Sequence, residues 1–204
     1  MADLIISWRQ AWGQPELPFA QVQLANHGKR LDQPSKTSAL AGFRDSQFVA
    51  ASKLPKTGLV VTIDIGEENN IHPGNKQDVG KRLAAWALGT VYGKDIVYSG
   101  PVFESMQVKG AEVHLTFTHT GSGLMTKGHQ LKGYAVAGED KQWHWADARI
   151  EGTKVVVKSD AVPAPVAVRY AWADNPECNL YNKEGFPAMP FRSDPRTIPA
   201  DYNK

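Results

Sequence analysis

The sequence predicts a chain of two parts, an α/β region over residues 1–94 and an antiparallel β-sandwich with a surface tail over residues 95–204. Three observations support this prediction. Helical and strand patterns alternate up to about Lys94, as they do in α/β folds. Short runs of alternating apolar and polar residues follow, and glycine-containing turns separate them. The last roughly thirty residues are rich in proline and asparagine.

Five elements are expected in the first region. Apolar residues at helical spacing between Leu4 and Trp12 predict a helix that Gly13 ends. The other expected elements are a strand at 20–24, a helix within 40–51, a strand at 59–65 and a helix with an apolar face over 79–91, which Asn75 caps with Asp78 three residues on.

The expected strand at 59–65 is almost wholly apolar, which is typical of a strand covered on both faces in a parallel sheet. Two strands are fewer than such a three-layer fold needs, and the chain opens on a helix that no strand precedes. We therefore expect the first region to be the carboxyl-terminal part of an α/β domain.

Composition and charge argue against several classes of function. With 23 basic and 21 acidic residues, the net charge is +2, and no cationic face is concentrated enough to predict nucleic-acid binding. No apolar run approaches the roughly 20 residues of a membrane span, and residues 1–9 do not read as a signal peptide, so a cytoplasmic location is expected. Cys178 is the single cysteine, which excludes an intrachain disulfide. No metal and no cofactor is expected, because the six histidines lack ligand spacing.

His72 is the candidate catalytic residue. It follows the expected buried strand and precedes the capped helix, at the place where α/β folds put catalytic groups. An imidazole there could take a proton from a serine hydroxyl and return it to a leaving alcohol. On position alone, a solvated loop residue or a partner of the helix cap is the favoured interpretation of His72.

Six sequence blocks resemble the sialate O-acetylesterase family. They are Leu17–Asn26, Thr62–Glu67, Ile71–Pro73, Asn75–Ala84, Val168–Trp172 and Asn179–Asp194. The resemblance implies a serine esterase with an SGNH-type, flavodoxin-like hydrolase domain and a β-sandwich accessory domain, acting on O-acetylated sugars, chiefly sialic acid. It also implies that His72 is the general base, and that full-length relatives are often secreted, periplasmic or lysosomal.

Two departures from the family pattern limit this prediction. The chain resembles the carboxyl-terminal portion and lacks the block with the nucleophilic serine; Ser122, flanked by glycines, reads as a turn serine. Asn70 stands where the family has an aspartate that orients the histidine. Its carbonyl oxygen can accept a hydrogen bond from the ring, so Asn70 is the predicted orienter of His72. Asp64 is a possible substitute, although a structural role is favoured for Asp64.

Aromatic and basic residues of the second region suggest an alternative function. Trp143, Trp145 and Trp172 could stack on sugar rings, although core packing is favoured. Arg169 and Arg192 could bind a sugar carboxylate, although an ion pair within the protein is favoured.

Three hypotheses follow. The first is a sialate O-acetylesterase that is incomplete or inactive as this chain alone. The second is a non-catalytic carbohydrate-binding or interaction module. The third is a split enzyme, in which a separate amino-terminal half carries the serine.

Overall fold

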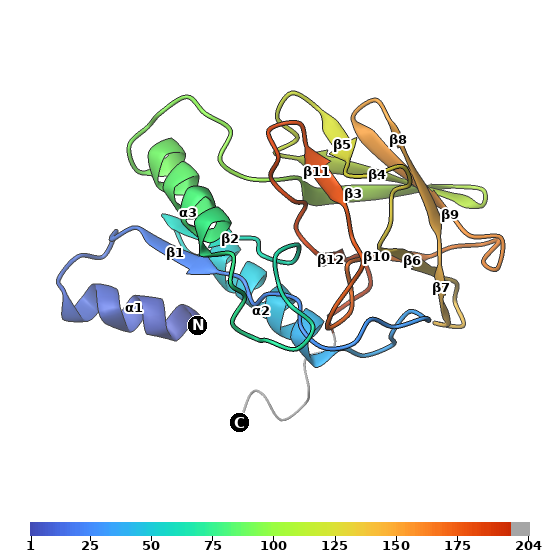
Figure 1. Ribbon diagram of the computed structural model, residues 1–204, viewed down its shortest axis with the longest axis horizontal. Helices are drawn as coiled ribbons and strands as arrows, with labels where there is room; N and C mark the ends of the chain where they lie inside the picture. Colours follow the sequence, from blue (N-terminus) through green and yellow to red (C-terminus); the bar gives the residue numbers. More distant parts are fainter. Residues whose placement is uncertain (197–204) are drawn as a thin grey trace.

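The computed structural model describes residues 1–196, and it contains two regions that lie side by side along the longest axis (Figure 1). The first region alternates helices and strands, as predicted. Its elements are α1 (Ala2–Ala11), β1 (Phe19–Val22), α2 (Ala39–Lys53), β2 (Thr57–Val60) and α3 (Lys76–Thr90).

The two strands of the first region pair in parallel, which confirms the predicted direction. Phe19 is opposite Thr57, and Val22 is opposite Val60. Helix α3 packs so closely on β2 that a Cβ atom added to Gly58 would lie 2.1 Å from the Trp86 ring. The position therefore requires glycine, because a methyl group there would displace the helix.

Strand β2 ends at Val60, five residues before the predicted end. The side chains of Val61 and Ile63 leave the parallel pair and enter the core of the second region. Thr62 is held by its hydroxyl, which donates to the Gln23 carbonyl at 2.6 Å. The apolar run at 59–65 is thus buried as predicted, but its second half packs in the core of the second region and not in the parallel sheet.

Helix α3 begins as predicted, because the Asn75 side chain accepts a hydrogen bond from the Asp78 backbone N–H at 3.1 Å. The predicted apolar face is less buried than expected. Arg82 is the buried residue of the helix, whereas Val91 is 44% exposed. The physical reason is that the Arg82 guanidinium reaches under the helix to oxygen atoms of the β2–α3 loop.

The second region is built from antiparallel strands, as predicted. One four-stranded sheet has the order β3 (Val102–Lys109), β4 (Glu112–Thr118), β9 (Lys154–Lys158), β8 (Asp147–Glu151). The other has the order β12 (Phe191–Arg192), β10 (Ala167–Tyr170), β6 (Tyr134–Ala137), β7 (Trp143–Trp145). Strands β5 (Leu124–Thr126) and β11 (Leu180–Asn182) form a separate pair.

One apolar core joins the strands of the second region. Alternate residues of β4, among them Val113 and Leu115, point into it and are fully buried. Val136 of β6 and Val168 of β10 enter the same cluster from the other four-stranded sheet. The region therefore has a hydrophobic core of its own.

The predicted surface tail is wrong for the part that the structure describes. Strands β11 and β12 lie in this segment, and Leu180 and Ala188 are fully buried. Phe191 stacks on Phe103 of β3 with ring centroids 4.2 Å apart. Proline and asparagine made the segment look like a loop, but its apolar residues complete the core. Residues 197–204 of the predicted tail lie outside the described residues.

Buried polar contacts fasten the two regions together. Arg44 of α2 is 1% exposed and donates to four backbone carbonyls at 2.7–2.8 Å. Two of these, Leu24 and Ala25, belong to the first region, and Ala173 and Asp174 belong to the second. Burial lowers the pKa of Arg44 to about 10, so the group stays charged at neutral pH.

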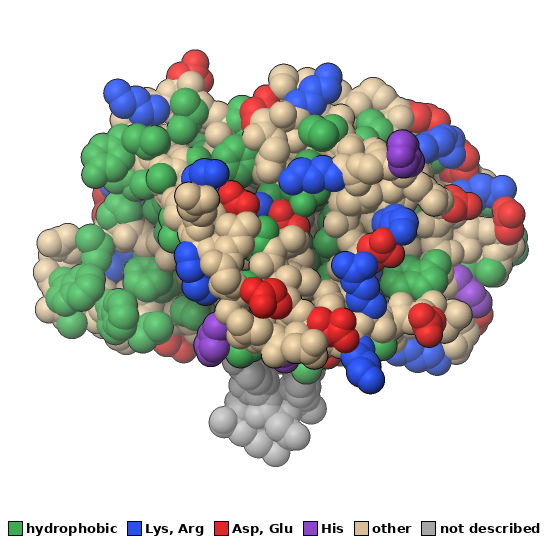
Figure 2. All heavy atoms as spheres, in the orientation of Figure 1, with side chains coloured by type: hydrophobic (Ala, Val, Ile, Leu, Met, Phe, Trp, Pro, Cys, Tyr) green, Lys and Arg blue, Asp and Glu red, His purple; other side chains and the backbone are tan. Residues whose placement is uncertain are grey.

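The surface of the first region is rich in exposed apolar side chains. Figure 2 shows them gathered over α1 and around α3. Trp8 of α1 is 44% exposed, and Trp12, which directly follows the helix, is 58% exposed. Among residues 1–196, no helix combines the length and the apolar character that crossing a membrane requires.

Candidate active site

His72 lies in the loop that connects β2 to α3, as predicted. The loop runs from Val61 to Asn75, and the His72 side chain is exposed while the neighbouring Pro73 is buried. An exposed imidazole on a fixed backbone can exchange protons with a group that approaches from solvent or from another chain segment.

Asn70 makes a different contact from the one predicted. Its side-chain carbonyl oxygen accepts a hydrogen bond from the His72 backbone N–H at 2.9 Å. This bond closes a turn of the kind that asparagine side chains favour. Among residues 1–196 no hydrogen bond reaches the His72 ring, so Asn70 shapes the loop here and does not orient the imidazole.

A second side chain closes the same loop from the other end. Glu67 pairs with Asn70 in an antiparallel bridge, and one of its carboxylate oxygens accepts from the Gly74 backbone N–H at 2.6 Å. The backbone on both sides of His72 is therefore tied to fixed partners. These bonds fix the backbone of His72, while its imidazole makes no hydrogen bond to the described residues.

Asp64 has a structural role, in agreement with the favoured interpretation. Its carboxylate receives two hydrogen bonds from the Arg82 guanidinium, both at 2.7 Å, and one from the Tyr181 hydroxyl at 2.9 Å. Burial and the neighbouring Asp64 carboxylate raise the pKa of Tyr181, which keeps the phenol protonated as a donor. Both carboxylate oxygens of Asp64 are thus hydrogen-bonded within the protein, which fixes the loop before His72.

Tyr181 was not singled out from the sequence, although it lies within one of the six family-like blocks. It reaches Asp64 across 117 positions in the chain, so no local pattern could reveal the contact. The same is true of Asn26, whose side-chain oxygen accepts from the Gly66 backbone N–H at 2.7 Å and whose amide donates to Asn175 at 2.8 Å. These residues position the loop and do not touch His72.

The segment at 27–28 supports the loop along its length. The Gly28 backbone N–H donates to the Glu68 carbonyl at 2.9 Å, and a His27 ring nitrogen lies 3.3 Å from the Glu67 carbonyl oxygen. A Cβ atom added to Gly66 would lie 2.1 Å from the Asn26 carbonyl oxygen, so the loop passes this segment at the closest approach that glycine permits.

Ser122 is a turn serine, as the sequence favoured. Its backbone N–H and its hydroxyl both donate to the Glu184 carboxylate, at 2.9 and 2.5 Å. In the described part of the chain, His72 has no serine hydroxyl as a hydrogen-bond partner. The geometry thus provides a base and its supporting loop without a nucleophile beside them.

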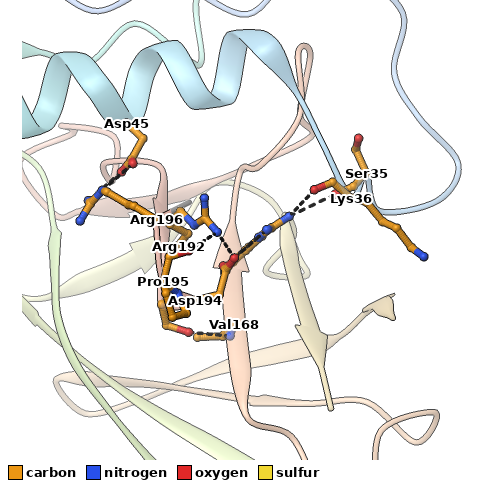
Figure 3. Close-up of polar contacts among 10 residues, drawn as sticks. Ser35, Lys36, Asp45, Val168, Arg192, Asp194, Pro195 and Arg196 are labelled. Atoms are coloured by element: carbon orange, nitrogen blue, oxygen red, sulfur yellow. Dashed lines mark hydrogen bonds and ion pairs between the residues drawn. The ribbon is translucent and has the colours of Figure 1, made fainter. Parts of the chain in front are cut away.

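Arg169 and Arg192 bind within the protein. Arg169 makes two hydrogen bonds to the Asp194 carboxylate, at 2.8 and 2.9 Å, and a third to the Lys36 carbonyl at 3.0 Å. Arg192 contacts the same carboxylate (Figure 3). Burial alone would raise the pKa of Asp194, but the hydrogen bonds from the two guanidinium groups outweigh it and lower that pKa.

Two of the three candidate tryptophans pack on this arginine cluster. The Arg169 guanidinium lies 4.0 Å from the Trp143 ring centroid and 5.0 Å from the Trp172 centroid. These cation–π contacts use the aromatic faces that a sugar would need. Trp145, which is 41% exposed, is the third.

No metal-binding cluster is present within residues 1–196, where no three histidine, cysteine, aspartate or glutamate side chains are grouped as ligands.

The chain is similar in sequence and in fold to proteins named as esterases. No family model matches the chain. Sialate O-acetylesterases from Pongo abelii and Homo sapiens are each 28% identical to it over 217 residues, which cover 92% of this chain and 40% of each relative. The sialate O-acetylesterase from Mus musculus is 26% identical over 213 residues, or 93% of this chain and 39% of the relative.

A solved structure agrees with these relatives. The crystal structure of a carbohydrate acetylesterase from Xanthomonas citri superposes with a TM-score of 0.88 and 44% sequence identity, covering 95% of this chain and 45% of that protein. This chain spans about two-fifths of the length of the curated relatives it matches. The similarities therefore confirm the resemblance to the sialate O-acetylesterase family over more than nine-tenths of the chain.

Proposed function

We propose that this chain provides the histidine-bearing part of a carbohydrate O-acetylesterase with an SGNH-type hydrolase domain. The observation that carries the proposal is the position of His72, exposed on a loop that Asp64, Asn70 and Asn26 hold in place. The similarity to esterases over the same residues supports it.

The proposed reaction needs a serine hydroxyl that the described residues do not place beside His72. The His72 imidazole removes the hydroxyl proton as the oxygen attacks the acetyl carbonyl, and it then gives that proton to the sugar oxygen that leaves. An acetyl-serine results. Water, deprotonated by the same imidazole, releases acetate and restores the serine. The substrate is an O-acetylated sugar, with sialic acid the first to test.

A chimera tests the role of His72 in a complete protein. This chain replaces the segment of the Xanthomonas citri acetylesterase that it matches, and hydrolysis of p-nitrophenyl acetate and of O-acetylated sialic acid is measured. The chimera is expected to be active, and His72→Ala is expected to lower kcat by about a thousandfold or more. His129→Ala, a change to another exposed loop histidine, is the matched control and should leave kcat unchanged.

The chain alone is expected to hydrolyse neither ester measurably. Hydrolysis by the chain alone that disappears with His72→Ala would contradict the need for a serine from elsewhere. Full activity of a folded His72→Ala chimera would contradict the assignment of His72 as the base.

Asn70→Asp refines the same test. Aspartate keeps the carbonyl-like oxygen that accepts from the His72 backbone and adds a negative charge that stabilises an imidazolium. We expect the variant chimera to gain tenfold or more in kcat. An unchanged kcat would show that position 70 only shapes the loop.

A further inference from the structure

A concave site lies in the described residues, away from the His72 loop. It is a pocket of about 610 Å³, between the segment at 30–32, the end of β7 and the segment at 173–177. His72, Asn70 and Asp64 are not among the residues that line it. Its volume is in the range of pockets that bind small organic ligands.

Trp145 supplies an aromatic surface to this pocket. Its indole N–H donates to the Asp32 carbonyl at 2.8 Å, which fixes the ring while leaving 41% of the residue exposed. A large apolar ring fixed at the edge of a polar pocket suits the apolar face of a pyranose, whose hydroxyl groups point outward around the ring.

Carboxylates in the pocket provide acceptors for sugar hydroxyl groups. Asp147 is exposed and receives a single, long hydrogen bond of 3.3 Å from the Gln130 amide. Asp160 is exposed and is bound through one oxygen to Lys158 at 2.8 Å. Each carboxylate therefore keeps acceptor capacity that no described side chain uses.

The cations of the pocket are already paired. Lys132 lies 2.7 Å and Arg30 lies 3.9 Å from the same carboxylate oxygen of Glu177, and Lys158 is paired with Asp160. Four carboxylates line the pocket against these three cations, so an anionic ligand would enter a site of net negative charge; the carboxylates are Asp32, Asp147, Asp160 and Glu177. The pocket thus favours an uncharged ligand over a sialic acid carboxylate.

We propose that this pocket is a carbohydrate-binding subsite for an uncharged saccharide, with Trp145 as the stacking surface and Asp147 and Asp160 as hydrogen-bond acceptors. The proposal does not depend on esterase activity. The pocket is connected through the chain to the His72 loop. The segment that contributes Arg30 and Asp32 follows Gly28, whose backbone N–H donates to a carbonyl of that loop.

Calorimetric titration of the whole chain tests the proposal. The probes are cellotriose, maltotriose, chitotriose and lactose, with 3′-sialyllactose as the anionic counterpart of lactose. At least one neutral saccharide is expected to bind saturably at millimolar concentration or below. Trp145→Ala should weaken that binding at least tenfold, and Asp160→Asn should weaken it severalfold. Sialyllactose should bind no more tightly than lactose.

Matched controls separate binding from folding. Trp12→Ala removes a tryptophan that directly follows α1, is 58% exposed and lies outside the pocket, and it should leave the affinity unchanged. Because Trp145→Ala also removes the bond to Asp32, the Asp160→Asn variant provides an independent test at an exposed side chain. The thermal midpoint of each variant identifies any that fail to fold.

Three results would overturn the proposal. The first is that no neutral saccharide of the panel binds at millimolar concentration. The second is binding that neither Trp145→Ala nor Asp160→Asn weakens, which would place the ligand elsewhere. The third is a clear preference for sialyllactose over lactose, which would contradict the choice of an uncharged ligand.

Discussion

The two regions of the molecule bury their apolar residues in different ways. Among residues 1–196, the main core cluster draws only Val61 and Ile63 from the first region, and every other member comes from the second. The first region instead exposes many of its large apolar side chains: Leu4, Ile6, Trp8, Trp12, Val22, Phe43, Leu88, Val91 and Tyr92.

This difference indicates which interactions stabilise each region. The second region is held by its own core, whose strands bury alternate residues against one another. The first region has a two-stranded parallel sheet with partly uncovered helices, and buried polar bonds attach it to the second. Its stability should therefore depend more on the junction than on its own apolar packing.

The sharpest test compares two leucine truncations. Leu115→Ala in β4 removes a fully buried side chain and is expected to lower the free energy of unfolding by about 3–5 kcal/mol. Leu88→Ala in α3, where the side chain is 42% exposed, should cost less than about 1 kcal/mol. Urea unfolding measures both, and equal losses would show that the two regions are packed alike.

The junction is tested by Arg44→Met. Methionine preserves the apolar stem but leaves the carbonyls of Leu24, Ala25 and Ala173 without a donor, which should lower the free energy of unfolding by about 3 kcal/mol. The Asp174 carbonyl still accepts from the His27 backbone N–H at 3.1 Å. Arg149→Met, at a half-exposed arginine of β8, is the control and should leave the free energy of unfolding nearly unchanged. A similar small cost for both variants would mean that the buried bonds do not fasten the regions.

The smallest expected effect is a pH dependence from Asp194. Its pKa is lowered in the folded chain, so its contribution to stability is present above the unfolded pKa of about 3.9 and is lost as pH falls through the folded value. Asp194→Asn should therefore flatten the fall of the thermal midpoint below about pH 4. An unchanged slope would contradict this role of the arginine cluster.

Local signals gave the correct helices and the loop of His72. The cap of α3, for example, joins Asn75 to Asp78 three residues on, and such a pair is visible in the sequence. Asn70 bonds the backbone N–H two residues on, which competes with the imidazole for its side-chain oxygen, and its part in catalysis stays a prediction.

Long-range contacts account for the other errors. Phe191 is buried because Phe103 lies opposite it, and Arg82 is buried because Asp64 and Tyr181 meet under α3. No spacing pattern in the sequence carries those pairings. The boundary at residue 94, the cytoplasmic location and the catalytic role of His72 stay predictions.

The four carbonyls that bind the Arg44 guanidinium also affect how the chain folds during synthesis. Two of these carbonyls lie 129 and 130 positions after the arginine. At the usual rate of translation, on the order of 10 residues per second, helix α2 waits roughly ten seconds for them. During that interval the cation has half of its final partners, so we expect α2 to dock fully only after strand β10 has left the ribosome.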